Sequence, residues 1–130
     1  MKIGLLGYGK MGKLIEQLAV SQGLIIAAKM SRLTDVEAIK DVDVCIDFSN
    51  AACVHEHVAL AGEAGKNIVI GTTGWEDRLP AVRELVEKHS MGMLHATNFS
   101  IGANLFRLIV REAARLMDPD RKSTRLNSSH

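Results

Sequence analysis

The feature that most constrains this chain is a short apolar run, residues 2–6, followed at once by the sequence Gly-Tyr-Gly-Lys-Met-Gly at 7–12. This order predicts a β-strand that ends in a tight turn and leads into a helix. Gly7 permits the turn, Gly9 lets bare backbone approach a ligand, and Gly12 lets the helix lie close to the strand. Because the start of a helix attracts anions, the segment is typical of a dinucleotide pyrophosphate site, although glycines also serve ordinary turns.

Strand and helix signals alternate along the rest of the chain, which predicts parallel strands joined by helical crossovers. We therefore expect an α/β fold, a Rossmann-like doubly wound parallel sheet of about five strands with helices on both faces. The expected strands are residues 2–6, 24–30, 42–47, 67–71 and 91–96, and the expected helices are 11–21, 51–64, 80–88 and 103–117. Residues 31–40 are too few for a comfortable crossover helix, although one or two turns could form there.

Composition predicts one domain and excludes some classes of function. We place a dinucleotide-binding domain at residues 1–118 and a disordered or appended tail at 119–130, which has no periodic apolar face. The formal net charge of +1 argues against an overall attraction to nucleic acid or anionic membranes. No apolar stretch approaches the ~18 residues that span a bilayer, so we expect a cytoplasmic protein. Cys45 and Cys53 lack metal or redox spacing and are expected to be buried, reduced thiols.

In open α/β sheets the ligand lies across the carboxyl ends of the strands, so the residues after each strand are candidates for a binding site. About 20 residues beyond the glycine turn, an acid is typical of NAD enzymes and an arginine of NADP enzymes. Ser31 and Arg32 stand at that distance, Lys29 is nearby, and no carboxylate intervenes before Asp35. We therefore expect NADPH to be favoured over NADH, unless Arg32 is simply an exposed loop charge. Lys10 is expected beside the phosphates or in solvent.

The ends of the later strands also carry candidate binding residues. Phe48 is expected to cover the cofactor or to pack in the core, while Ser49 or Asn50 caps the next helix. The segment after the fourth strand offers two hydroxyls and a compliant backbone that suit an amide such as the nicotinamide carboxamide, or only a turn; its residues are Gly71, Thr72 and Thr73. A polar turn after the fifth strand completes the cleft with Ala96, Thr97, Asn98 and Phe99.

The histidines do not suggest a catalytic or metal site. His55 and His57 are two positions apart, which places them on different sides of a helix, so we expect surface or capping roles. His95 is close to the expected cleft but is read as a hydrogen-bonded strand residue rather than a catalytic one. We therefore assign no catalytic residue and no metal ligand within this sequence.

Four segments, in this order, resemble landmarks of the 4-hydroxy-tetrahydrodipicolinate reductase family, also called dihydrodipicolinate reductases; they are residues 7–12, 44–49, 70–75 and 98–104. The resemblance covers about residues 1–117 and implies NAD(P)H-dependent reduction of 4-hydroxy-tetrahydrodipicolinate to tetrahydrodipicolinate, in lysine and diaminopimelate biosynthesis. Two departures are visible. Thr97 stands where many members have proline, and residues 29–32 lack the acid that many members carry near the end of the second strand.

The resemblance also implies roles for individual residues. The residues that would bind the pyrophosphate are Gly7, Tyr8, Gly9, Lys10, Met11 and Gly12. Ser31 and Arg32 would lie at the ribose and distinguish a free 2′-hydroxyl from a 2′-phosphate. The nicotinamide side would be lined by Gly71, Thr72, Thr73, Ala96, Thr97, Asn98 and Phe99. The family further implies a small dicarboxylate substrate, a homo-oligomeric full-length enzyme, and a second domain with a His-His pair, a lysine and a Ser-Gly-Thr segment. Because this sequence has none of these motifs, we expect it to bind cofactor without reducing substrate.

Two other functions fit part of the pattern. A stand-alone NAD(P)-sensing or regulatory domain would share the fold, but the broad apolar set within residues 101–117 argues mildly against a chain that ends there. A homoserine or aspartate dehydrogenase-like protein would share the nucleotide-binding half. The run at residues 98–102 disfavours that alternative.

Overall fold

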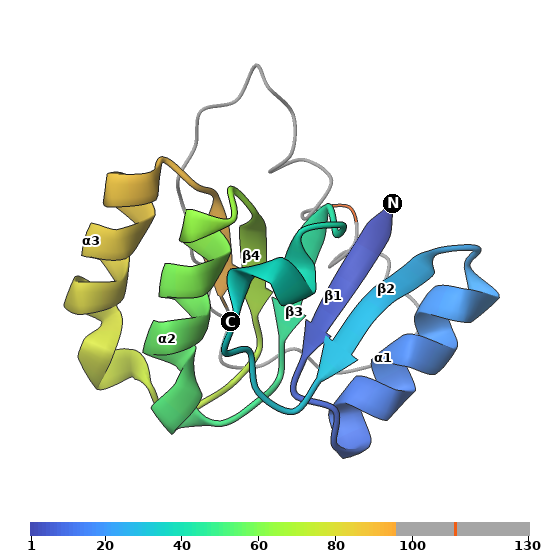
Figure 1. Cartoon of the computed structure of the whole chain (residues 1–130). Coiled ribbons are helices and arrows are strands. Elements are labelled where there is room, and N and C mark those ends of the chain that lie inside the picture. Colours follow the sequence, from blue (N-terminus) through green and yellow to red (C-terminus); the bar gives the residue numbers. More distant parts are fainter. Residues whose placement is uncertain (96–110, 112–130) are drawn as a thin grey trace.

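The computed structural model describes residues 1–95 and 111, and within them five parallel strands form one sheet (Figure 1). The strands are β1 (Lys2–Leu6), β2 (Ile25–Met30), β3 (Val44–Asp47), β4 (Asn67–Ile70) and β5 (Met93–His95). Their order across the sheet is β2-β1-β3-β4-β5, and every neighbouring pair is parallel. The expected doubly wound α/β fold is therefore confirmed.

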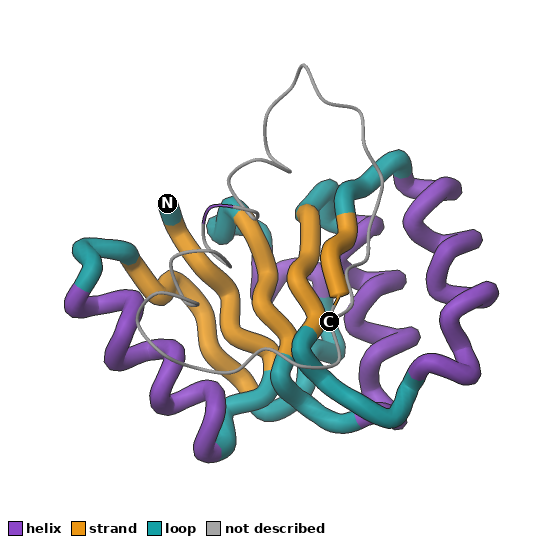
Figure 2. The backbone as a smooth tube through the Cα atoms, turned by 180° about the vertical axis from the view of Figure 1, so that it is seen from behind, coloured by secondary structure: helices purple, strands orange, loops and turns teal. Residues whose placement is uncertain are grey.

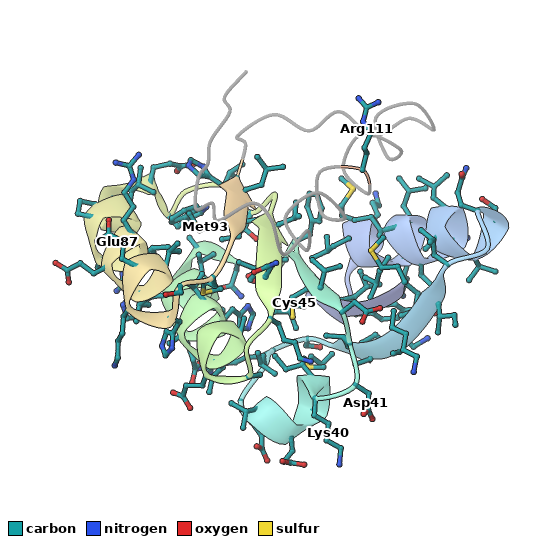
Figure 3. All side chains as sticks on the ribbon, turned by 90° about the horizontal axis from the view of Figure 1, so that it is seen from above. Lys40, Asp41, Cys45, Glu87, Met93 and Arg111 are labelled. Atoms are coloured by element: carbon teal, nitrogen blue, oxygen red, sulfur yellow. The ribbon has the colours of Figure 1, made fainter. Side chains whose placement is uncertain are left out.

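Within residues 1–95, three helices cover the two faces of the sheet: α1 (Lys10–Ser21), α2 (Ala51–Glu63) and α3 (Leu79–His89). Figure 3 shows α1 on one side and α2 with α3 on the other. Side chains alternate along each strand, so neighbouring strand residues enter different cores. Leu5 and Ile46 pack toward Ile15 of α1, whereas Leu6 and Cys45 join the core under α2 and α3.

The connection between β2 and β3 holds a single turn of 3₁₀ helix (Val36–Ile39), which agrees with the expectation that a full crossover helix does not fit. Asp35 begins the turn, because its side chain accepts a hydrogen bond from the Glu37 N–H. Leu33 and Ile39 are both fully buried against α2 and its neighbours. These two apolar anchors hold the segment onto the sheet without a long helix.

Local signals explain where the helices begin and end. Asn50 caps α2 by accepting a hydrogen bond from the Ala52 N–H, as expected. Gly23 and Gly65 follow α1 and α2 with φ of 79° and 73°, a conformation that glycine adopts without strain. The strands are up to two residues shorter than expected at individual ends; Val42, for example, precedes β3 and donates to the Ile39 carbonyl. Of the helix expected at 103–117 only residue 111 is described, and the tail at 119–130 lies outside the described residues.

Both cysteines are buried free thiols, as expected. Burial raises the pKa of the Cys45 thiol to about 12, and the carboxylate of Asp47 acts in the same direction. No helix among residues 1–95 combines the length and the apolar character needed to cross a membrane.

Candidate functional site

The strand order reverses at the carboxyl ends of β1 and β3. From β1 the chain first passes to β2 on one side, and later returns to β3 on the other side. The loops after the strands gather along one edge of the sheet, the lower edge in Figure 2. Ligands of open α/β sheets bind where the strand order reverses in this way. The glycine turn after β1 and the loop after β3 therefore define the candidate site.

The three glycines of the turn meet different constraints. Gly7 has φ of 96°, and a Cβ atom there would lie 2.4 Å from the Phe48 carbonyl oxygen. A Cβ atom on Gly12 would lie 2.4 Å from the Gly7 carbonyl oxygen, so glycine lets α1 pack against the turn. Gly9 differs, because among residues 1–95 and 111 no atom beyond its chain neighbours lies within 4 Å of the position that its Cβ would take. The protein itself leaves room at Gly9.

The start of α1 fits an anionic group placed in that room. Gly9 is the N-cap residue and supplies no side-chain hydrogen bond, and the first turn holds no acidic residue. The first N–H groups of a helix have no partner within the helix, and the helix dipole adds partial positive charge there. Lys10 is exposed beside them, and Met11 is half-buried against the α1 side of the core. These features together suit a pyrophosphate.

A polar cluster adjoins the glycine turn at the end of β2. The Lys29 Nζ lies 2.8 Å from a Glu16 carboxylate oxygen and 4.8 Å from the centre of the Tyr8 ring. The Tyr8 hydroxyl donates to the other oxygen of Glu16. The hydrogen bond between Lys29 and Glu16 lowers the pKa of the carboxyl and raises the pKa of the amine. Lys29 is therefore held against α1.

Arg32 is also paired with a carboxylate. Its Nε and Nη2 lie 3.1 and 2.8 Å from Oε1 of Glu56 on α2, and this contact raises the pKa of the guanidinium. The pair is open to solvent, with 58% of the Arg32 side chain and 41% of the Glu56 side chain exposed. Ser31 beside it is exposed. Glu16 and Glu56 were missed by sequence reasoning, because both lie on helices and reach the end of β2 and the loop after it only through the fold.

Phe48 lies between two loops of the site. Its carbonyl oxygen lies against Gly7, and its ring occupies the space beside Gly71, where a Cβ atom would come within 2.2 Å of the ring. The residue is half-buried, and its ring packs with the core on the α1 face. The expected packing of Phe48 in the core is therefore confirmed, and its place beside the glycine turn leaves its contact with a cofactor a prediction.

Asp47 at the end of β3 is fully buried and accepts hydrogen bonds from several donors. Its Oδ1 accepts from the Ser49 N–H at 2.9 Å, the Ser49 hydroxyl at 2.5 Å and the Thr72 hydroxyl at 2.9 Å. The Thr72 hydroxyl, which the sequence suggested for an amide ligand, is thus engaged inside the protein. Thr73 next to it is exposed.

His57 corrects a prediction, because the expected surface or capping role is wrong for it. The side chain is fully buried on α2, with Nδ1 2.8 Å from Oδ2 of Asp47. Its Nε2 accepts the Leu33 N–H at 3.0 Å. A helix turns by about 100° per residue, so His57 faces the sheet while His55, two residues earlier, is only half-buried. The two-residue spacing correctly predicted that the two rings lie on different sides of the helix, but it did not show which ring points inward.

Trp75 closes the β4 end of the site. Its indole N–H donates to the Thr72 carbonyl oxygen at 2.8 Å, and its ring meets His95 edge-on at 5.3 Å between centroids. Partial burial lowers the pKa of His95. Ala96, Thr97, Asn98 and Phe99 lie outside the described residues. Within residues 1–95 and 111, no group of three or more His, Cys, Asp or Glu side chains could hold a metal ion.

Comparisons with known proteins agree with this architecture. Residues 1–99 match the family model for the dihydrodipicolinate reductase N-terminus. Among curated relatives, the 4-hydroxy-tetrahydrodipicolinate reductase of Christiangramia forsetii is 33% identical over 119 residues, covering 90% of this chain and 50% of the relative. That of Acinetobacter baumannii is 32% identical over 140 residues, covering 88% of this chain and 51% of the relative.

An archaeal relative extends the comparison. The 4-hydroxy-tetrahydrodipicolinate reductase of Methanothermobacter thermautotrophicus is 34% identical over 88 residues, covering 67% of this chain and 32% of the relative. The chain spans about half the length of the first two relatives. Since the family model matches most of the chain, from the strand before the glycine turn to residue 99, this protein belongs to the dihydrodipicolinate reductase family.

Proposed function

We propose that this chain is the cofactor-binding half of a 4-hydroxy-tetrahydrodipicolinate reductase, an NAD(P)H-dependent oxidoreductase of lysine and diaminopimelate biosynthesis. Family membership favours this function over a stand-alone NAD(P) sensor. The structural observation that carries it is the open space at Gly9 beside the uncapped start of α1, because it fits a pyrophosphate.

The proposed site follows the edge of the sheet. The glycine turn holds the phosphates, the loop after β2 meets the ribose of the adenosine, and the loops after β3, β4 and β5 border the nicotinamide. The cofactor-binding residues we propose are Gly7, Tyr8, Gly9, Lys10, Met11, Gly12, Ser31, Arg32, Phe48, Gly71, Thr72, Thr73, Ala96, Thr97, Asn98 and Phe99. Since the Thr72 hydroxyl is bound to Asp47, Thr72 would contribute its backbone and its position rather than a free hydroxyl.

The bound cofactor supplies the hydride, and the residues of this chain bind and orient it. None of the described residues is proposed as a proton donor to the substrate. We propose that the intact enzyme, a homo-oligomer in the cytoplasm, binds a small dicarboxylate through residues beyond this nucleotide-binding half. On this proposal the 130-residue chain binds cofactor but does not turn over substrate.

We also propose that NADPH is preferred over NADH. Arg32 and Lys29 bring two positive charges to the β2 end of the site, although each is paired with a glutamate. An ion pair that is open to solvent is weak, so Arg32 can exchange Glu56 for a doubly charged 2′-phosphate at little cost. A guanidinium binds a phosphate with charge-assisted and often paired hydrogen bonds.

The test uses Trp75, the single tryptophan of the sequence, as an internal reporter. Its indole is hydrogen-bonded to Thr72, in the loop that we place beside the nicotinamide. NADPH binding should therefore quench the Trp75 emission by energy transfer to the dihydronicotinamide. Gly9→Ala should abolish that quenching while keeping the fold, because the added methyl group meets no protein atom but occupies the ligand's space. If Gly9→Ala binds NADPH as tightly as wild type, the pyrophosphate does not lie at the glycine turn.

A further inference from the structure

A buried chain of hydrogen bonds runs beneath the proposed cofactor site. It starts at the Leu33 N–H in the loop after β2, passes through the His57 ring to Oδ2 of Asp47, and continues from Oδ1 of Asp47 to Thr72. All four residues are less than 7% exposed. Three loops that border the site are thereby joined by side chains that the sequence did not single out as a unit.

The direction of these bonds fixes the protonation of the ring. A backbone N–H can only donate, so Nε2 of His57 accepts from Leu33 and carries no proton. Nδ1 then carries the proton and donates it to Asp47. Asp47 in turn accepts on both oxygens. No member of the chain can rotate without leaving a buried polar atom unpaired, and such an atom is costly.

The two ends of the chain lie at opposite ends of the proposed site. Leu33 follows Arg32, which we place at the ribose of the adenosine. Thr72 follows Gly71, and its carbonyl oxygen accepts a hydrogen bond from the indole N–H of Trp75, on the nicotinamide side. Asp47 stands between them at the point where the strand order reverses.

We propose that His57 is a positioning residue which, through Asp47, couples the loop at the adenosine end of the cofactor site to the loop at the nicotinamide end. This inference rests on the proposed cofactor site. It adds that buried hydrogen bonds preorganise the site. When the loop at one end becomes ordered, the loop at the other end becomes ordered too, so a change in one loop alters the affinity for the part of the cofactor that the other loop binds.

The test uses calorimetry to measure binding of NADPH and of ADP-ribose. ADP-ribose carries the adenosine and the pyrophosphate of the cofactor but neither its 2′-phosphate nor its nicotinamide. Thr72→Val removes the hydroxyl at the nicotinamide end, and we expect it to weaken ADP-ribose binding about fivefold. Thr72→Ser keeps the hydroxyl and should recover most of the affinity that Thr72→Val loses. Because the hydroxyl of Thr72 is buried and hydrogen-bonded to Asp47 and to the Ser49 N–H, the expected effect passes through these buried bonds rather than through ligand contact.

Variants of the ring itself provide the second arm. His57→Asn keeps a donor near the Nδ1 position but no acceptor for Leu33, so we expect ADP-ribose and NADPH to bind about tenfold more weakly. His57→Gln places an acceptor near the Nε2 position and should restore part of that loss. His55→Asn, on the same helix but half-buried, is the matched control and should bind like wild type.

The outcomes separate this inference from the proposed function. If wild type binds neither ligand, both are overturned. If wild type binds but Thr72→Val leaves ADP-ribose affinity unchanged, or His57→Asn matches His55→Asn, the coupling alone is overturned. Nitrogen-15 spectra of the wild-type imidazole need no variant to fold: they should show His57 with its proton on Nδ1, and a proton on Nε2 would contradict the chain of bonds.

Discussion

Glycines three residues apart in the same turn are required for different reasons. A methyl group on Gly12 would lie 2.4 Å from the Gly7 carbonyl oxygen, which is backbone and cannot move without shifting the turn. We expect Gly12→Ala to lower the free energy of unfolding by about 1–3 kcal/mol, as overpacking does elsewhere. Urea denaturation measures this, with Gly9→Ala as the control for an open position. Equal stability of the two variants would contradict the close packing of α1 on the turn.

The pairing of Arg32 with Glu56 predicts a change in cofactor preference. Glu56→Gln removes the carboxylate that competes with a 2′-phosphate, so we expect NADPH to bind about two- to fivefold more tightly while NADH changes little. Titrations of both cofactors by Trp75 fluorescence give the ratio. Glu63→Gln, exposed on the same helix, should leave the ratio unaltered. An unchanged ratio in Glu56→Gln would place the 2′-phosphate away from Arg32.

Residues whose role is local could be predicted from the sequence, whereas those that act through the fold could not. The spacing of Gly7, Gly9 and Gly12 encodes a backbone conformation, so the pattern alone identified the turn. His57 and Glu56 reach the β2 loop from a helix that begins about twenty residues later in the chain. Their contacts depend on how α2 is rotated against the sheet, and no short-range pattern records that rotation.

At the scale of elements, β5 carries a pH-dependent contribution to stability. Burial lowers the pKa of His95 below the ordinary value of 6.5, with Arg83 adding to the shift and Glu76 opposing it. At a pH between the lowered pKa of His95 in the folded chain and the ordinary value of 6.5, the unfolded chain binds more protons than the folded one. The free energy of unfolding therefore falls as the pH drops below about 6.5.

We therefore expect His95→Phe, which retains a ring against Trp75, to lose less stability than wild type between pH 7 and pH 5. Urea denaturation at both pH values measures the difference in the free energy of unfolding. The contributions of the other histidines cancel in the comparison, because wild type and variant both contain them. An identical loss in the two proteins would show that burial of His95 does not penalise its charged form.

The elements themselves were predictable because each strand is an apolar run and each helix has an apolar stripe. The path between β2 and β3 was predicted only as a short connection in which one or two turns could form. There Asp35 caps a single turn and Leu33 and Ile39 are buried, so tertiary burial rather than periodicity shapes the segment. Strand ends were overestimated for a related reason: Val42 is apolar and buried but bonds to its own turn rather than to a neighbouring strand.

For the molecule as a whole, the sheet is a single hydrogen-bonded unit with a core on each face, and Cys45 lies near its centre on β3 (Figure 3). Its thiol is fully buried, and a pKa of about 12 leaves almost no thiolate at pH 8. Since thiol reagents attack the thiolate, Cys45 should react only when the sheet opens.

This makes Cys45 a reporter of global opening and of ligand binding at once. In a Cys53→Ala variant, where Cys45 is the only thiol, we expect labelling at pH 8 to be at least about a thousandfold slower than in the urea-unfolded chain. A ligand that binds only the folded chain stabilises it by mass action, so NADPH at about 100 times its Kd should slow labelling about a hundredfold further. Gly9→Ala in the same background should lose only this second effect. Fast labelling without urea would mean that β3 opens locally, and slowing by NADPH that persists in Gly9→Ala would separate cofactor binding from the glycine turn.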